Sequence, residues 1–300
     1  MVEYTLKPYQ LIQIENVAVA DFLSSDHKNL DSKTVSSFGE EWNKFSSFDE
    51  KEIKKIGDDY FDIVDSSMLN KDSIVLDVGC GMGRWSYYVS DRAKWVEAID
   101  PSDSIYRAAP FLQSKKNVRI TKASVENIPF ADESFDFIFS LGVLHHVPNT
   151  QEAIHQCVKK IKKGGYFLLY LYYNLDNRGF FSKILFHISN WGRKIISRLP
   201  SKLKLIVCDM LAVVIYLPFV FLSRTIKFIF PKKNGYKKIP LSYYSDKSFH
   251  VIRNDSLDRF GTPLEQRFSE KQIRKMLELA GMTNIVFSQR EPYWHVISKK

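Results

Sequence analysis

The sequence predicts an α/β fold in which a doubly wound, mostly parallel sheet is followed by a helical insertion. Short apolar runs alternate with helical patterns from residue 74 to residue 172, as in parallel strands joined by right-handed crossovers. The pattern then stops and returns only from Phe268 onward. The expected parts are an N-terminal arm (1–49), a core (50–173), a basic and apolar helical insertion with the loop after it (174–261), and a C-terminal completion of the core (262–300).

A glycine-rich turn follows the first apolar run of the core. Residues 74–78 predict a buried strand, and Gly79, Gly81 and Gly83 come directly after it. Glycines let the backbone turn sharply and approach a ligand closely. Asp100 ends the next apolar run, at the distance typical of a carboxylate that holds the ribose of an adenosine. Because the turn lacks the third glycine of a dinucleotide-binding motif, it favours S-adenosylmethionine (SAM) over a nicotinamide dinucleotide.

The segments after this turn follow a recognisable order. Residues 123–130 lead into an apolar run at 135–140, which a helical pattern and a further apolar run follow. This order resembles the class I SAM-dependent methyltransferases, in particular the ubiquinone-biosynthesis-like (type 11) methyltransferase domain. The resemblance covers residues 35–173 and, more loosely, 262–298. It implies SAM as the cofactor and a seven-stranded Rossmann-like sheet with the insertion after the fifth strand.

The resemblance also implies a set of cofactor-binding residues. These are Asp77, Gly79, Cys80, Gly81, Asp100, Pro101, Ser124, Val125, Ser140 and Leu141. The first four would face the methionine part of SAM, Asp100 would hold the ribose, and the last two would border the reactive methyl group. Relatives carry an acid at the place of Ser124, beside the adenine. A hydroxyl accepts a hydrogen bond more weakly than a carboxylate does, so the backbone of Val125 would carry more of the recognition.

Two pairs of residues are candidates for a general base. His145 and His146 follow the fourth predicted strand, and because the unperturbed pKa of an imidazole is close to neutral, either would serve as the base for a hydroxyl acceptor. A structural role at the start of a helix is the alternative for each of them. The second pair, His250 and Asp258, lies in the loop expected after the insertion, which resembles the substrate-side loop of relatives.

Elements at the two ends of the core are also predicted. Residues 50–69 form a helical pattern that leads into the first strand. Ser269 is an expected N-cap and Gly281 the expected end of the following helix. The last two strands are expected at 283–287 and 293–297, as an antiparallel pair.

Cysteine usage and the N-terminal region narrow the class of protein. The three cysteines lie far apart, so we expect no disulfide framework, no metal site and a cytoplasmic location. The first residues carry an acid and no apolar run, so no signal peptide is expected. Residues 37–45 resemble a segment found ahead of this domain in relatives. In that segment Phe38 and Trp42 would either plug the domain edge or cap the cofactor pocket.

The insertion carries most of the basic charge. Residues 178–238 hold thirteen Lys and Arg and a single acid, Asp209, whereas the net charge of the whole chain is +9. Residues 205–222 are almost wholly apolar, but only 14 uncharged residues separate Asp209 from Arg224, fewer than the roughly 20 of a spanning helix. The alternatives are an amphipathic pair that contacts an anionic membrane peripherally, a lid on the core, and a channel for an anionic substrate.

The expected reaction is methyl transfer from SAM to a small-molecule or lipid-linked acceptor, with O-methylation favoured. A nucleic-acid methyltransferase is the first alternative, but residues 140–143 lack the Asp/Asn-Pro-Pro-aromatic turn of enzymes that methylate exocyclic amines. Nucleic acid is therefore disfavoured as a partner. A non-catalytic scaffold with the same fold is the second alternative, and the intact glycine turn with Asp100 argues against it.

Overall fold

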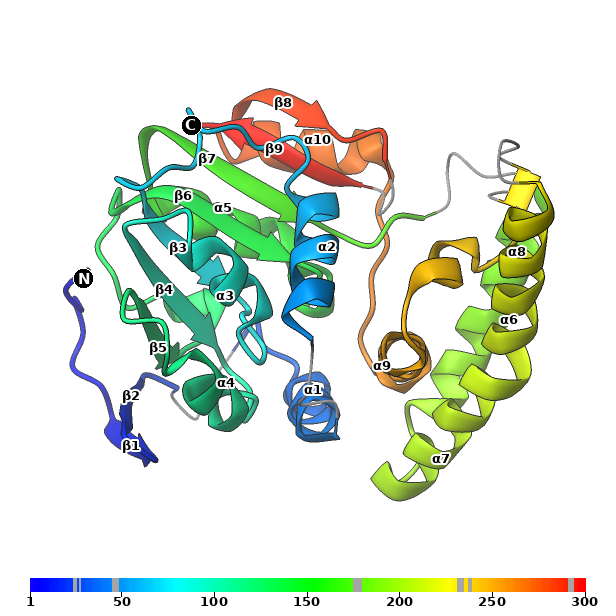
Figure 1. Ribbon diagram of the computed structural model, residues 1–300. Coiled ribbons are helices and arrows are strands. Elements are labelled where there is room, and N and C mark those ends of the chain that lie inside the picture. The colour runs from blue at the N-terminus through cyan, green and yellow to red at the C-terminus, as the bar shows by residue number, and fades with distance from the viewer. Residues whose placement is uncertain are drawn as a thin grey trace. The chain divides into compact units, whose positions relative to one another are not determined.

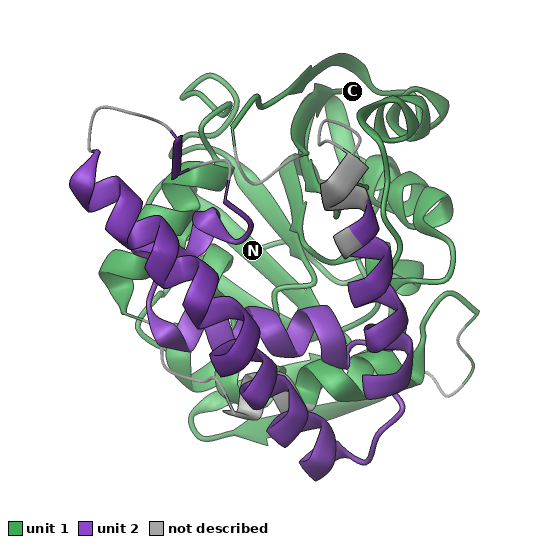
Figure 2. Cartoon of the chain, turned by 90° about the vertical axis from the view of Figure 1, so that its right-hand side faces the viewer, with its two compact units in different colours: residues 1–174, 264–300 green, residues 175–263 purple. Residues whose placement is uncertain are grey.

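The computed structural model describes residues 1–300 except 24–25, 27, 45–48, 175–179, 231–234, 237–238 and 291–293, and except the side chains of 40–44, 180–183 and 185. The chain divides into two compact units, drawn in green and purple in Figure 2. Unit 1 comprises Met1–Asn174 and Leu264–Lys300, and unit 2 comprises Leu175–Pro263. The N-terminal arm belongs to unit 1.

Unit 1 is built on a nine-stranded sheet with the order β1-β2-β5-β4-β3-β6-β7-β9-β8 (Figure 1). The strands are β1 (Gln10–Ile14), β2 (Val17–Asp21), β3 (Ile74–Val78), β4 (Trp95–Asp100), β5 (Val118–Lys122), β6 (Phe135–Leu141), β7 (Ile161–Tyr170), β8 (Thr283–Phe287) and β9 (His295–Lys299). The strands from β2 to β7 in this order pair in parallel, and β9 pairs antiparallel with both β7 and β8. The strand order reverses between β3 and β6, so the carboxyl ends of these strands frame the crevice where an open α/β sheet binds its ligand.

The sheet contains the seven expected strands and two more from the N-terminal arm. The β1–β2 hairpin turns at Glu15, whose φ is +50°, and β2 extends the sheet through the pairs Ala20↔Thr121 and Asp21↔Lys122. The last strand begins at His295, two residues later than predicted. The helix expected at 50–69 is shorter and ends at Tyr60.

Six α-helices of unit 1 are described. They are α1 (Ser32–Lys44), α2 (Glu50–Tyr60), α3 (Arg84–Ser90), α4 (Ile105–Leu112), α5 (Thr150–Lys160) and α10 (Glu270–Leu279). The predicted caps of α10 are confirmed, because Ser269 forms a capping box with Gln272 and Gly281 follows the helix with a φ of +87°.

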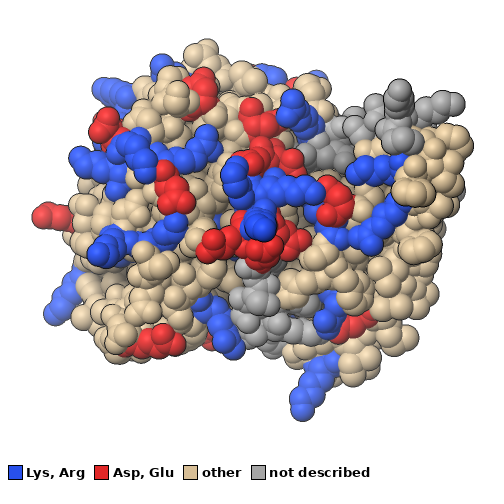
Figure 3. Space-filling model, viewed as in Figure 1, with Lys and Arg blue, Asp and Glu red and all other residues tan. Residues whose placement is uncertain are grey.

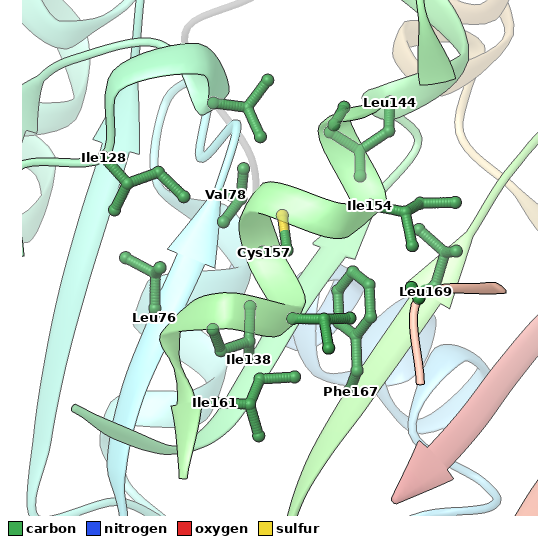
Figure 4. Close-up of a cluster of buried hydrophobic side chains, with 14 of the residues drawn as sticks. Leu76, Val78, Ile128, Ile138, Leu144, Ile154, Cys157, Ile161, Phe167 and Leu169 are labelled. Atoms are coloured by element: carbon green, nitrogen blue, oxygen red, sulfur yellow. The ribbon is translucent and has the colours of Figure 1, made fainter. Parts of the chain in front are cut away.

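The core fixes α5 against the sheet. Figure 4 shows Ile154 and Cys157 of this helix among Leu76, Ile138 and Phe167 of three strands, and all five side chains are fully buried. A buried side chain of this kind stabilises the fold by about 1.5–3 kcal/mol. Because α5 is held in this way, the loop between β6 and α5 is held at the carboxyl edge of the sheet.

Unit 2 is helical in its described part. Its elements are α6 (Phe180–Ile196), α7 (Ser201–Leu211), a π-helical turn η3 (Ala212–Tyr216), α8 (Leu217–Ile229), a 3-10 turn η5 (Ser242–Asp246) and α9 (Phe249–Gly261). From α7 to α8 the chain forms one continuous helix, Ser201–Ile229. Pro218 lies in the first turn of α8, directly after the π turn, where the Leu217 N–H donates to Ala212 O five residues back.

One prediction for unit 2 was wrong. Residues 250–258, expected as a loop, lie in α9. The Ser248 hydroxyl caps this helix by accepting a hydrogen bond from the Val251 N–H, and the buried residues Ile252, Ser256 and Phe260 recur every four positions. His250 and Asp258 are therefore helix residues, one in the first turn and one near the end.

Candidate active site

The glycine turn after β3 has the conformation that its residues predict. Gly79, Gly81 and Gly83 have φ values of +80°, +54° and +89°, which favour glycine. The Gly79 N–H donates to Ile99 O at 2.8 Å, which ties the turn to the end of β4. A Cβ atom on Gly79 would lie 2.3 Å from Val143 Cγ1, so no larger residue fits beside the loop that follows β6.

Asp100 lies against the same turn. Its Oδ2 accepts a hydrogen bond from the Gly81 N–H at 2.8 Å, and its Oδ1 accepts from the Ser102 N–H at 2.8 Å and from the Ser102 hydroxyl at 2.6 Å. The carboxyl group is buried, and burial raises its pKa. The structure thus brings together the two parts on which the adenosine prediction depends.

A second buried acid lies beneath the turn. Asp77 accepts a hydrogen bond from the Ser86 hydroxyl at 2.6 Å, and burial raises its pKa to about 8, with a further contribution from Asp100. The neighbouring Cys80 thiol is buried, and burial raises its pKa as well. A cationic ligand beside Asp77 and Asp100 would favour the ionised form of both carboxyl groups.

The remaining predicted cofactor residues border this edge of the sheet. The Ala123 N–H donates to Asp100 O at 3.2 Å, which places Ser124 and the 3-10 turn η1 (Val125–Asn127) next to the acid. The Ser124 hydroxyl is buried and has no hydrogen-bond partner in the described part of the chain. Such an orphaned hydroxyl fits a polar group of a nucleoside.

Two more of these residues lie on the other strands of the edge. The Ser140 hydroxyl donates to Val78 O at 2.9 Å and so joins the ends of β6 and β3, and Leu141 is buried beside it. Pro101 is half-buried after Asp100. The glycine cradle, the buried acid and the orphaned hydroxyl together fit SAM.

The two histidines differ in their proton positions. His146 Nδ1 lies 2.7 Å from Leu264 O, and because a carbonyl oxygen only accepts, Nδ1 carries the proton and Nε2 the lone pair. His145 Nδ1 instead accepts from the Tyr172 N–H at 3.4 Å, so its proton lies on Nε2. Burial, with His146 and Arg267 nearby, lowers the pKa of His145 well below its usual value. His146 therefore has the tautomer of a general base, whereas the lone pair of His145 is engaged by the backbone.

The comparison with known families agrees with this geometry. Residues 76–169, from β3 to β7, match a methyltransferase domain family of type 11. Unit 1 contains a class I SAM-dependent methyltransferase domain.

Three curated relatives share this domain. The chain is 31% identical to the uncharacterized methyltransferase YcgJ of Bacillus subtilis over 33% of its own length and 40% of that protein. It is 34% identical to a ubiquinone biosynthesis O-methyltransferase of Alkalilimnicola ehrlichii over 31% of its length and 38% of the relative. It is 34% identical to a tRNA U34 carboxymethyltransferase of Nautilia profundicola over 33% of its length and 34% of the relative. The chain spans less than half the length of these relatives.

Aromatic and charged residues that the sequence did not single out lie beside the candidate histidines and at the end of β7. The Tyr172 ring lies 3.9 Å from the His145 ring between centroids, and the Arg267 guanidinium lies 5.0 Å from the Tyr172 centroid. Arg267 is held by Glu265, which accepts a hydrogen bond from its Nε at 2.7 Å. Tyr60 contacts the Tyr170 ring at 5.1 Å. Only their positions in the sequence could have indicated these residues. Tyr172 follows β7, and Arg267 directly precedes the segment where the core pattern resumes.

Helix α1 covers the carboxyl edge of the methyltransferase sheet. The Phe38 ring meets the His146 ring edge-on at 4.9 Å, after β6, and the Thr34 hydroxyl accepts from the Leu264 N–H at 3.1 Å. A Cβ atom on Gly39 would lie 3.5 Å from Asp103, after β4. Helix α1 therefore reaches from the end of β6 to the end of β4, across the end of β3. The side chain of Trp42 lies outside the described residues.

The alternative base candidates lie in unit 2. Asp258 accepts a hydrogen bond from the Thr262 hydroxyl at 3.3 Å near the end of α9, and His250 lies in the first turn of that helix. Asp255, on the same helix, accepts a hydrogen bond from the Tyr216 hydroxyl at 2.9 Å. Burial raises the pKa of Asp255 to about 6. This network joins α9 to the π turn of the long helix.

Proposed function

We propose that this chain transfers the methyl group of SAM to a hydroxyl group of a small or lipid-linked, amphiphilic acceptor. The observation that carries the proposal is the contact between Asp100 and Gly81 at the point where the strand order reverses. A glycine turn and a carboxylate in that position suit an adenosine. The methyltransferase domain supplies the reaction class, and the relative that is named as an O-methyltransferase favours oxygen as the acceptor atom.

Each part of the site has a distinct task in this reaction. SAM, when bound, supplies a methyl group that is already activated on a sulfonium. Asp100 would accept hydrogen bonds from the ribose, the glycine turn would leave room for the methionine part, and Ser124 would meet the adenine. His146 Nε2 accepts the proton of the acceptor hydroxyl as the new bond forms, and Leu264 O holds its ring in the required orientation.

The surroundings of His146 favour an acceptor with an apolar or aromatic body. Tyr170 ends β7 and Tyr172 lies two residues after it, with ring centroids 5.8 Å apart, and the Tyr172 ring also lies 5.7 Å from the His146 ring. Flat aromatic walls pack against rings and unsaturated chains. A phenol or a lipid-linked hydroxyl meets both requirements, because its body packs on the tyrosines while its oxygen faces the histidine.

The environment of the cysteines disfavours methylation at C5 of a pyrimidine. That chemistry needs a thiolate, whereas Cys157 is fully buried in the core and burial raises its pKa. Cys80 and Cys208 are also buried, and all three are free thiols, as in a cytoplasmic protein. We therefore propose that the enzyme works in the cytoplasm.

The cofactor assignment is tested by calorimetric titration of SAM. Asp100→Ala is expected to weaken binding by about 10- to 100-fold, because each hydrogen bond to an ionised group contributes about 1.5–3 kcal/mol. Asp103→Ala, which removes an exposed acid three residues further on, is the matched control and should bind SAM normally. An unchanged dissociation constant for Asp100→Ala would refute the ribose assignment.

The base assignment is tested by the release of S-adenosylhomocysteine with a panel of polyprenyl phenols and, separately, tRNA. His146→Gln is expected to lower turnover by about 10²–10⁴-fold at saturating SAM and to remove the lower pKa from the pH–rate profile. His145→Gln should keep that profile. Methylation of tRNA alone would overturn the proposed acceptor class, and equal losses in both variants would move the base elsewhere.

A further inference from the structure

The long helix Ser201–Ile229 turns an apolar face outward. Val214 and Phe221 are 67% and 70% exposed. Other apolar residues on the same helix are also exposed, namely Leu203, Ile206, Met210, Val213, Ile215, Phe219, Leu222, Phe228 and Ile229. A helix on the surface of a water-soluble domain normally places polar residues on this face. An apolar area of this extent marks a surface that contacts something other than water.

The opposite face of this helix is held by polar contacts with α9. The Asp209 carboxylate accepts two hydrogen bonds from Arg253, at 2.7 and 3.0 Å. Cys208 O accepts from the Ser256 hydroxyl at 2.7 Å, and the Tyr216 hydroxyl donates to Asp255. The polar face of the helix therefore points into unit 2, and the outward apolar face is a consequence of how unit 2 folds.

Helix α6 repeats this arrangement. Its apolar residues Ile184, Ile188, Trp191 and Ile195 recur at helical spacing and are all exposed, Trp191 by 68%. Arg193, by contrast, is buried, and its guanidinium donates to Thr262 O at 2.9 Å and Pro263 O at 2.8 Å. Figure 2 looks onto α6 and the long helix together, on one side of unit 2.

Basic residues accompany the two apolar faces. Lys194, Arg198, Lys202 and Lys227 are exposed, and the one acid of these helices, Asp209, is paired with Arg253. In the view of Figure 3, the surface over α8 is mostly uncharged, with Lys and Arg scattered along it. Apolar side chains flanked by lysines suit an anionic bilayer, because the apolar groups enter the interface while the amines meet the lipid phosphates.

From these observations we infer that unit 2 docks on an anionic lipid bilayer, with the outward faces of α6 and Ser201–Ile229 lying in the plane of its interface. In the described part of the chain, Ser201–Ile229 is the one helix long and apolar enough to cross a membrane. Crossing would strip Asp209 and Tyr216 of their partners on α9, whereas an in-plane position keeps these contacts. The 14 uncharged residues from 210 to 223 also cover only about 21 Å of the roughly 30 Å hydrocarbon core.

The test is flotation of the full-length protein with vesicles of phosphatidylglycerol and phosphatidylcholine, compared with vesicles of phosphatidylcholine alone. Without SAM, the wild type is expected to float with the anionic vesicles, so this inference does not rest on the proposed methyl transfer. Val214→Glu/Phe221→Glu is expected to lower partitioning by at least about tenfold, because charged side chains are costly at membrane depth. The matched control is Tyr9→Glu/Leu11→Glu, which adds the same charge at residues of unit 1 that are 67% and 70% exposed.

The charge requirement and the depth are tested separately. Lys194→Gln/Lys202→Gln should weaken binding to the anionic vesicles by about fivefold per lysine. Quenching of Trp191 by brominated lipid should place this residue at the interface, and Trp191→Phe identifies its share of the signal.

Three results would overturn the inference. The first is a wild type that stays with neither type of vesicle. The second is a protein that is dimeric without lipid and becomes monomeric in Val214→Glu/Phe221→Glu, because the apolar face would then join two copies of this chain. The third is resistance to alkaline carbonate extraction from cell membranes, which would indicate a helix that spans the bilayer.

Discussion

Unit 1 buries most of its large apolar side chains, whereas unit 2 exposes many of its own. In unit 1, Phe135, Phe137 and Phe139 of β6 are fully buried. In unit 2, Phe221 and Trp191 are mostly exposed while Arg193 and Lys204 are buried. The difference teaches that burial of apolar side chains away from water stabilises the sheet of unit 1, whereas the exposed apolar side chains of the unit 2 helices gain nothing from this effect.

The largest expected effect comes from the same substitution made in both units. Phe135→Ala should lower the free energy of unfolding by about 3–5 kcal/mol, because a fully buried ring that contacts Phe130 at 5.3 Å leaves a cavity. Phe221→Ala should change it by less than about 0.5 kcal/mol in water. Urea denaturation of the two variants beside the wild type measures both values. A loss above about 2 kcal/mol for Phe221→Ala would mean that this ring packs against protein, and the contrast between the units would fail.

An acid of unit 2 with a raised pKa gives the next largest effect. The pKa of Asp255 is about 6 in the folded chain and 3.8 in the unfolded chain. Between pH 3.8 and about 6 the folded state therefore binds more protons than the unfolded state. Stability contributed by this carboxyl is therefore lost as the pH rises through that window, by up to about 3 kcal/mol. Asp255→Asn should flatten the pH dependence of unfolding above about pH 4. Asp246→Asn, an exposed change in the same unit, is the control.

In unit 1, Asp77 is an acid with a raised pKa, and its ionisation should change when SAM binds. Asp77 has a pKa of about 8, so it is mostly protonated near neutral pH. The positive charge of SAM would favour the carboxylate, and binding should therefore release protons and strengthen by up to tenfold per pH unit as the pH rises toward 8. Calorimetry in two buffers of different ionisation enthalpy counts the released protons, and Asp77→Asn should reduce that number. An equal release in both proteins would place the titrating group elsewhere.

Strong local signals made much of unit 1 predictable. The strands around the glycine turn are continuous apolar runs, and such runs have few alternatives to a buried parallel strand. Ser269 and Gly281 could be assigned because capping depends on neighbouring residues alone. The fold class and the proximity of Asp100 to the turn were accessible for the same reason, since both follow from the order of strands along the chain.

Features that depend on partners distant in sequence were not predictable. The hairpin of the N-terminal arm has a largely exposed first strand and a turn at Glu15 that contains no glycine. Neither an alternation of apolar and polar residues nor a typical turn sequence therefore predicted it. Helix α9 packs Ser256 where an apolar residue would be expected, because the Ser256 hydroxyl donates to Cys208 O. The Glu265–Arg267 pair joins the site only through the return of the chain to the core.

The smallest effect compares one helix cap in each unit. Ser269 in unit 1 accepts from the Gln272 N–H at 3.2 Å, and its own N–H donates to Gln272 Oε1 at 2.9 Å, so two orphan donors are satisfied. Ser248 in unit 2 accepts from the Val251 N–H at the slightly longer distance of 3.3 Å. Ser269→Ala should therefore cost about 1–2 kcal/mol and Ser248→Ala about 0.5–1 kcal/mol, and Thr should restore most of either loss because its hydroxyl caps in the same way. Urea denaturation measures both. A larger loss at Ser248 would show that the first turn of α9 stabilises unit 2 through more than this one hydrogen bond.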